Sequence, residues 1–281
     1  MNTKKVWLVT GAGRGMGIDI AKAALDAGHA VVATGRDIAA VESVLGASEN
    51  LLILKLNVHQ FADAEDAAKK AVERFGRIDV LVNNAGNFVA GYFEDLSPTD
   101  IEKQMATNLC GPMNVTRAIL PIMREQGSGH VITISSSAGL MGFEFASAYA
   151  ASKFAVEGWL LSLQSEIAPF GINITIVNPG FFRTDLLSKK SMIFASNPQE
   201  AYKTKREQNE AGWAAMGGTQ AGDPVKLAQA LLQIANLDNP PKRFVAGTDA
   251  VAMAKQVASD LQAQSEATLE LSTNLAFDQV A

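Results

Sequence analysis

The feature that most constrains the fold is a repeated alternation of short apolar runs with segments of helical periodicity. The apolar runs are rich in β-branched residues and rarely alternate with polar positions, which indicates strands buried on both faces. Strand–helix–strand repetition predicts right-handed crossovers, and hence an α/β fold whose parallel sheet of about seven strands carries helices on both faces. The predicted strands are Val6–Thr10, Ala30–Thr34, Leu51–Leu56, Val80–Asn83, His130–Ser135, Asn173–Val177 and Arg243–Val245.

No linker or low-complexity tract divides the sequence, so we predict one doubly wound domain over residues 1–281. Two regions depart from the alternation. Residues 185–223 show no clear strand and are too long for a simple connection, which favours a lid over a substrate site. Residues 247–281 follow the last predicted strand as a C-terminal extension, with helical character over Val251–Leu269.

Composition excludes several classes of function. The chain has 281 residues and a formal net charge of -5, without the basic patch that is typical of nucleic-acid-binding proteins. Cys110 is the single cysteine and the three histidines are scattered, so we expect no metal site. No apolar stretch approaches the ~20 residues of a membrane span, and the N-terminus lacks a signal peptide's apolar core. We therefore expect a cytoplasmic protein that binds neither nucleic acid nor membrane.

A glycine-rich loop lies between the first predicted strand and the first predicted helix. It reads Thr10-Gly11-Ala12-Gly13-Arg14-Gly15-Met16-Gly17. Glycines allow the backbone to turn tightly and to approach a pyrophosphate, whose charge is then stabilised at the helix N-terminus. Met16 replaces the glycine that the G-x-G-x-x-G spacing requires, and Gly11, Gly15 and Gly17 fit G-x-x-x-G-x-G instead. The loop predicts a Rossmann dinucleotide-binding domain.

The end of the second predicted strand bears on the choice of cofactor. An NAD site usually places an acidic residue there to bind the ribose 2′-hydroxyl. This strand ends in Gly35 followed by Arg36, whose guanidinium suits a 2′-phosphate, and Arg14 could add a second positive charge. Asp37 also lies near the expected distance, but we interpret it as the N-cap of the next helix. The pattern favours NADP(H), and NAD(H) remains possible.

Tyr149 and Lys153 stand four residues apart in a segment that is predicted to be helical, so their side chains share one face. An ammonium beside a phenol stabilises the phenolate, so we expect Lys153 to lower the pKa of Tyr149. Such a phenol is a candidate general acid or base at neutral pH. A Tyr-x-x-x-Lys pair alone is weak evidence, because an amphipathic helix can carry one by chance.

With the glycine loop and this pair in order, the chain resembles the short-chain dehydrogenase/reductase family from about Val6 to about Val245. Asn108 matches the family's catalytic asparagine, and Ser136, thirteen residues before Tyr149, matches its catalytic serine. The resemblance implies hydride transfer between NADP(H) and a carbonyl or secondary alcohol. In that reaction Tyr149 is the general acid/base, Lys153 holds the nicotinamide ribose, Ser136 binds the oxyanion and Asn108 orders a water.

The resemblance also supplies cofactor contacts, because Asn83-Asn84-Ala85-Gly86 and Asn178-Pro179-Gly180 match two family motifs near the adenosine and the nicotinamide. Asn57-Val58 stands where the family usually has Asp-Val, so an uncharged amide would meet the adenine amine. The expected cofactor-binding residues are Gly11, Arg14, Gly15, Met16, Gly17, Arg36, Asn57, Val58, Asn84, Ala85, Gly86, Tyr149, Lys153, Pro179, Gly180 and Thr184.

The expected substrate side is mostly apolar, which predicts a hydrophobic ketone, aldehyde or secondary alcohol. A basic rim of Lys189, Lys190, Lys203, Lys205 and Arg206 keeps a 3-oxoacyl thioester open as a substrate. An NAD-dependent alcohol dehydrogenase and a non-catalytic NADP(H) sensor also stay open. Family members commonly pair through two long helices, here Pro98–Glu125 and Ala148–Ala168, so the resemblance implies a homodimer or homotetramer. The predicted lining residues are Met141, Phe143, Phe181, Phe182 and Leu186.

Overall fold

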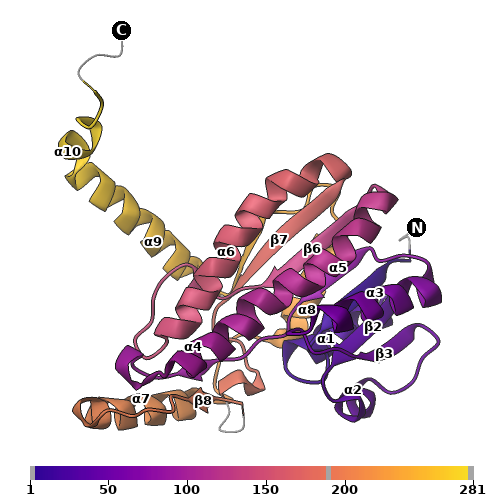
Figure 1. Ribbon diagram of the computed structural model, residues 1–281, viewed down its shortest axis with the longest axis horizontal. Coiled ribbons are helices and arrows are strands. Elements are labelled where there is room, and N and C mark those ends of the chain that lie inside the picture. The colour runs from indigo at the N-terminus through magenta and orange to yellow at the C-terminus, as the bar shows by residue number, and fades with distance from the viewer. Residues whose placement is uncertain (1–3, 188–190, 278–281) are drawn as a thin grey trace.

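The computed structural model describes residues 4–187 and 191–277. Its centre is a seven-stranded sheet in the order β3-β2-β1-β4-β6-β7-β9, in which each neighbouring pair is parallel (Figure 1). The predicted doubly wound α/β fold is therefore confirmed. The strands are β1 Val6–Thr10, β2 Ala30–Gly35, β3 Leu51–Lys55, β4 Val80–Asn83, β6 Gly129–Ile134, β7 Ile172–Pro179 and β9 Arg243–Ala246.

Helices cover both faces of the sheet and enclose two apolar layers. Successive side chains of a strand point to opposite faces, so Leu8 packs with α3, α5 and α6, while Val9 packs with α1, α2 and α8. Burial on both faces explains why these strands have apolar rather than alternating sequences. The helices are α1 Met16–Asp26, α2 Ile38–Leu45, α3 Phe61–Phe75, α5 Gly111–Gln126, α6 Ser147–Ile167 and α8 Pro224–Ile234.

Each predicted strand overlaps an observed one, but the sequence did not predict a second, small sheet. In that sheet β5 (Val89–Ala90) pairs in parallel with β8 (Ile193–Phe194). Residues 185–223, whose sequence shows no clear strand, therefore contain a short one. Two residues are too few to show a period, so only the tertiary pairing reveals this strand. The pairing joins the predicted lid to the segment that follows β4.

The predicted central helix over Pro98–Glu125 is interrupted in its middle. It consists of α4 (Pro98–Met105), a π-helical turn η2 (Ala106–Cys110) and then α5, and the amide of Gly111 donates to the carbonyl of Ala106. Pro112 explains the interruption, because in a regular helix its ring would clash with the carbonyl of residue 108. The π turn therefore places Asn108 at a locally widened point of the helix.

The predicted lid contains a helix, α7 (Lys203–Met216), besides β8. The C-terminal extension forms α9 (Thr248–Ala267) and α10 (Leu269–Thr273), in line with the predicted helix, and projects away from the domain (Figure 1). Within the described residues, no helix is long and apolar enough to cross a membrane. The remaining short helices are η1 Phe93–Asp95, η3 Ser137–Gly139, η4 Ala168–Phe170, η5 Asp185–Leu187 and η6 Glu200–Tyr202.

Candidate active site

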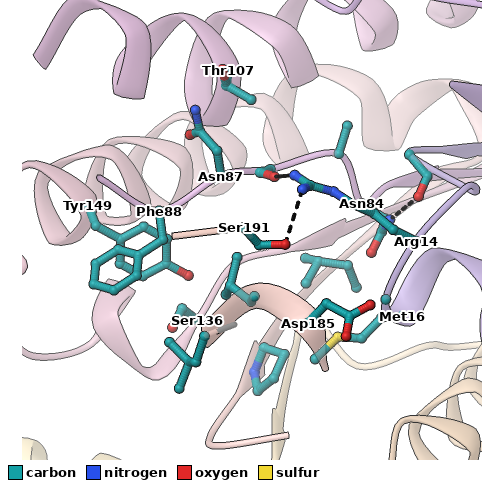
Figure 2. Close-up of a pocket in the computed structure, with 18 of the residues that line it drawn as sticks. Arg14, Met16, Asn84, Asn87, Phe88, Thr107, Ser136, Tyr149, Asp185 and Ser191 are labelled. Carbon is teal, nitrogen blue, oxygen red and sulfur yellow. Dashed lines mark hydrogen bonds between the residues drawn. The ribbon is translucent and has the colours of Figure 1, made fainter. Parts of the chain in front are cut away.

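A cavity of about 560 Å³ lies at the carboxyl ends of the central strands (Figure 2). Its wall is formed by segments that follow β1, β2, β3, β4, β6 and β7, together with η5 and parts of the predicted lid. In open α/β sheets a ligand binds outside these ends, where the strand order reverses, and here the reversal lies between β1 and β4. The topology alone therefore marks this cavity as the candidate site.

The glycine loop forms one end of the cavity and could accept a pyrophosphate. Gly15 precedes α1 with φ 54°, a conformation that glycine adopts without strain. A Cβ atom at Gly17 would lie 2.3 Å from the carbonyl oxygen of Gly11, so only glycine allows this close approach. The Asn84 amide holds the loop by donating to the carbonyls of Thr10 at 2.9 Å and Gly11 at 3.2 Å. These features fit the predicted dinucleotide.

Arg14 reaches from the glycine loop toward the lid. Its guanidinium donates to the carbonyl of Gly86 at 3.2 Å and to the Ser191 hydroxyl at 3.5 Å (Figure 2). Both bonds run to groups that also line the cavity. Arg14 therefore places a permanent positive charge where the loop, the end of β4 and the lid meet.

The residues predicted to bear on cofactor choice lie at the end of β2. Gly35, Arg36 and Asp37 all line the cavity, and Arg36 is exposed there. The Asp37 carboxylate accepts from the amide of Ala40 at 3.2 Å, which confirms its predicted role as the N-cap of α2. This hydrogen bond commits one carboxylate oxygen to the helix, whereas Arg36 extends beside it toward the cavity.

The expected adenine contacts are arranged differently from the family pattern. Asn57 and Val58 line the cavity, but the Asn57 side-chain oxygen already accepts from the amide of His59 at 3.2 Å. The Asn57 backbone amide donates to Asp63 at 2.9 Å. The His59 ring, which belongs to no motif in the sequence, also lines the cavity and contacts the Thr107 hydroxyl at 2.9 Å.

Ser136, Tyr149 and Lys153 come together on the opposite side of the cavity. The Lys153 ammonium lies 5.7 Å from the centre of the Tyr149 ring and donates to the carbonyl of Ile134 at 2.9 Å. Ser136 follows β6, and its hydroxyl accepts from the amide of Ala138 at 3.1 Å. The end of β6 and the first turns of α6 therefore present all three side chains to one space.

The expected lowering of the Tyr149 pKa is not found. Burial of the phenol raises the pKa of Tyr149, and the neighbouring Ser136 hydroxyl opposes that rise. Burial also lowers the pKa of Lys153 to about 8, while the carboxylate of Glu157 raises it. Desolvation is the largest cause of both shifts, and a phenol whose pKa lies above its usual value of about 10 is protonated at neutral pH.

Asn108 does not line the cavity. Its amide nitrogen donates to the carbonyl of Asn87 at 3.0 Å and to the Ser152 hydroxyl at 3.1 Å, and its oxygen accepts from the amide of Asn87 at 3.0 Å. Ser152 in turn donates to the carbonyl of Tyr149 at 2.7 Å. The structure thus connects Asn108 to the backbone of α6, and its predicted role in ordering a water remains a prediction.

An aromatic wall surrounds the Tyr149 phenol. Phe88 packs edge-on against the Tyr149 ring at 4.9 Å between centres and also contacts Trp213 of the lid at 5.3 Å. Phe181 lies 6.4 Å from Trp213 and 6.4 Å from Phe143. Sequence reasoning missed Phe88, because the residues after Gly86 carry no motif. These rings give the part of the cavity near Tyr149 an apolar lining.

Most of the remaining predicted residues also meet at the cavity. Phe182, Leu186, Met16, Ala85, Pro179 and Gly180 line it, whereas Met141, Thr184 and Gly17 do not. Gly17 packs against the Gly11 carbonyl and so shapes the loop from outside the lining. The Thr184 side chain lies near Gly15. Of the two predicted lining residues that follow η3, Phe143 lines the cavity and Met141 does not.

Acidic side chains connect the predicted lid, residues 185–223, to the rest of the domain. Asp95 is fully buried and pairs with Arg206 of α7 at 3.0 Å. Asp100 accepts from the Ser196 hydroxyl at 2.6 Å, and these hydrogen bonds lower its pKa to about 2 despite burial. Lys189 and Lys190 of the predicted basic rim lie outside the described residues.

Comparison with known proteins identifies the family. The short chain dehydrogenase family model matches residues 5–192, so the chain belongs to this family of oxidoreductases. Oxidoreductase BOA17 of Botryotinia fuckeliana is 36% identical, covering 95% of this chain and 98% of the relative. A 3-ketodihydrosphingosine reductase of Bacteroides thetaiotaomicron is 32% identical, covering 86% of this chain and 88% of the relative.

Solved structures agree with this assignment. A short-chain dehydrogenase from Streptomyces avermitilis is 36% identical and superposes with a TM-score of 0.88, covering 98% of this chain and 100% of that one. The closed form of a serine dehydrogenase complexed with NADP+ is 28% identical, with a TM-score of 0.72 and coverage of 85% of this chain and 93% of that one.

We expect Gly17→Ala to abolish dinucleotide binding. The added methyl group would lie 2.3 Å from the Gly11 carbonyl oxygen, so the loop must shift, at a cost of about 1–3 kcal/mol in stability. Fluorescence titration with NADPH and thermal unfolding measure the two effects. Gly212→Ala in α7 is the matched control, because nothing lies within 4 Å of its added methyl group. Normal NADPH affinity in Gly17→Ala would contradict the assigned role of the loop.

Proposed function

We propose that this protein is an NADP(H)-dependent reductase of hydrophobic ketones or aldehydes that uses Tyr149 as its general acid. The observation that carries the proposal is the position of the Tyr149 phenol. It lies in the same cavity as the glycine loop, beside Lys153 and Ser136, and it is enclosed by Phe88 and the lid. Such a cavity can hold a dinucleotide and a carbonyl compound together, with a proton donor between water-excluding walls.

Tyr149, Ser136 and Lys153 would each have a separate role in carbonyl reduction. NADPH, if bound along the glycine loop, would supply the hydride for the carbonyl carbon. Tyr149 donates its phenolic proton to the carbonyl oxygen, which otherwise would carry the developing negative charge. The Ser136 hydroxyl donates a hydrogen bond to the same oxygen and stabilises that charge. Lys153 supplies a nearby positive charge that stabilises the phenolate left behind, and it binds the ribose. Burial raises the pKa of Tyr149, so the phenol carries its proton at neutral pH.

Arg36 supports the preference for NADP(H). It follows β2, lines the cavity and stands where an acidic residue would select NAD(H). A guanidinium matches the geometry of a phosphate bidentately, and Asp37 beside it is engaged as a helix cap. The NADP+ complex of the related serine dehydrogenase is consistent with this choice.

We expect Arg36→Gln to weaken NADPH binding by about 10-fold or more, since hydrogen bonds to charged groups contribute roughly 1.5–3 kcal/mol. Affinity for NADH should stay unchanged, because NADH has no 2′-phosphate. Dissociation constants for both cofactors provide the measurement. Arg117→Gln, which removes an exposed guanidinium on α5, is the control. Equal weakening for NADPH and NADH would refute the proposed contact.

The substrate class follows from the lining near Tyr149. Phe88, Phe143, Phe181 and Trp213 offer apolar surface, which suits a hydrophobic carbonyl compound. Two cations of the expected basic rim have acidic partners, since Arg206 pairs with Asp95 at 3.0 Å and Lys203 lies 3.5 Å from Glu200. The relative named for reducing 3-ketodihydrosphingosine, a ketone, supports the same class.

A panel of carbonyl compounds tests this class. We expect aryl and alicyclic ketones to be reduced with kcat/KM at least about 10-fold above acetoacetyl thioesters, because the lining near Tyr149 is apolar and two of the rim cations have acidic partners. NADPH oxidation at 340 nm, with product identification, is the measurement. Preference for the thioesters would favour a 3-oxoacyl thioester reductase instead. NADPH binding without any turnover would favour a sensor.

We expect Tyr149→Phe to lower kcat by about 10²–10⁴-fold, the usual contribution of general acid catalysis. NADPH affinity should stay near that of the wild type, because the ring and its contact with Phe88 are preserved. Tyr202→Phe is the matched control, since its hydroxyl bonds Glu94 at 2.9 Å and lies outside the cavity lining. Turnover of Tyr149→Phe at the wild-type rate would show that another group donates the proton.

A further inference from the structure

Glu157 is a buried carboxylate on α6 that the proposed reaction does not use directly. Only 4% of its surface is exposed, and it stands one helical turn after Lys153. One carboxylate oxygen accepts from the Asn178 amide at 2.6 Å, and the other lies 2.7 Å from the Arg243 guanidinium. Glu157 therefore joins α6 to both β7 and β9.

Asn178 carries this connection to the end of β6. Its amide nitrogen has two protons, of which one goes to Glu157 and the other to the Ser136 carbonyl at 3.0 Å. Asn178 is fully buried and directly precedes Pro179 and Gly180, which line the cavity. This bridge from Glu157 through Asn178 to the Ser136 carbonyl thus fixes the backbone of Ser136 relative to α6, the helix that carries Tyr149.

The bridge has little freedom to rearrange. A Cβ atom at Gly139 would lie 2.9 Å from a Glu157 carboxylate oxygen and 2.7 Å from the Ser135 hydroxyl, so the turn after Ser136 packs directly on the carboxylate. A second hydrogen bond, from Lys153 to the Ile134 carbonyl at 2.9 Å, joins α6 to β6 one turn earlier. Two side chains of one helix therefore hold one strand end.

We propose that Glu157 is a positioning residue for catalysis, which through Asn178 sets the place of Ser136 relative to Tyr149. This inference rests on the proposed reductase function. The bond to Asn178 and the charge beside Lys153 are separate properties of one carboxylate, so substitutions can remove them one at a time.

The negative charge of Glu157 changes the pKa of Lys153 in a defined direction. Burial lowers the pKa of Lys153 to about 8 and Glu157 raises it, so loss of the carboxylate must lower that pKa further. Removing a negative charge also favours ionisation of Tyr149, so both groups would lose their protons at lower pH. The other charged groups of this region are Arg243 behind Glu157, Asp249 at the start of α9, whose carboxylate accepts from the Phe181 amide at 2.7 Å, and Arg14 and Asp185 in the cavity wall. All of them are retained when Glu157 alone is substituted.

Glu157→Gln removes the charge and keeps an oxygen for Asn178. In this variant we expect the alkaline limb of the reduction profile, which reports loss of protons from Lys153 and Tyr149, to move to lower pH. At the optimum pH, kcat should remain within about threefold of the wild type, because Ser136 stays in place. Glu166→Gln, an exposed carboxylate on the same helix, controls for the change in net charge and should leave the limb unmoved.

Glu157→Asp keeps the charge and withdraws the oxygen from Asn178. Here we expect kcat to fall roughly 10- to 100-fold, as misplacement of a catalytic group does, with the alkaline limb close to that of the wild type. Dissociation constants for NADPH and thermal unfolding are measured alongside for both variants. If kcat fell equally in Glu157→Gln and Glu157→Asp, and the alkaline limb of the pH profile moved in neither, Glu157 would have only a structural role. That result would overturn the proposal.

Two signals that need no turnover separate this inference from the proposed function. The ε-methylene resonance of Lys153, assigned with a Lys153→Met variant, reports its pKa, and the amide resonance of Ser136 reports its position. We expect the Lys153 titration to move to lower pH in Glu157→Gln and the Ser136 amide to shift in Glu157→Asp. Unchanged resonances overturn the inference, whereas a wild-type protein that reduces no carbonyl overturns only the function.

Discussion

Parallel pairing of the central strands is the constraint on which the site depends. Because β1, β4, β6 and β7 run in one direction, their carboxyl ends meet at one edge, and the loops that follow them converge there. The glycine loop, Asn84, Ser136 and Pro179 are close in space although they are far apart in the sequence. The apolar layers on both faces of the sheet hold this edge in place, so the site inherits the rigidity of the core.

The sequence predicted the parts of this architecture that arise from local patterns. Most of the seven sheet strands are apolar almost throughout, and Asp37 caps α2 as its position before a helical segment indicates. The role of the loop glycines was predictable for the same reason, because the close backbone approach at Gly17 leaves no room for a side chain. Where one residue type satisfies one local requirement, the sequence is sufficient.

Features that depend on contacts between distant segments were not predictable. The pairing of β5 with β8 involves two residues on each strand, too few to produce a pattern. Phe88 becomes part of the site because Trp213 of the lid packs against it at 5.3 Å. The π turn around Asn108 follows from Pro112, yet a helical pattern continues through it, so the interruption stayed hidden.

The Tyr149–Lys153 pair illustrates how burial changes the meaning of a motif. The spacing places the two side chains together, but it carries no information on solvation, and desolvation reverses the expected direction of the phenol's pKa. The protonated phenol of Tyr149 can donate its proton as long as the Lys153 ammonium, whose pKa is lowered to about 8, stays charged. Glu157 is the nearby carboxylate that raises the pKa of Lys153, and the same group reaches Ser136 through Asn178. One buried side chain on α6 therefore affects both the charge of Lys153 and the position of Ser136.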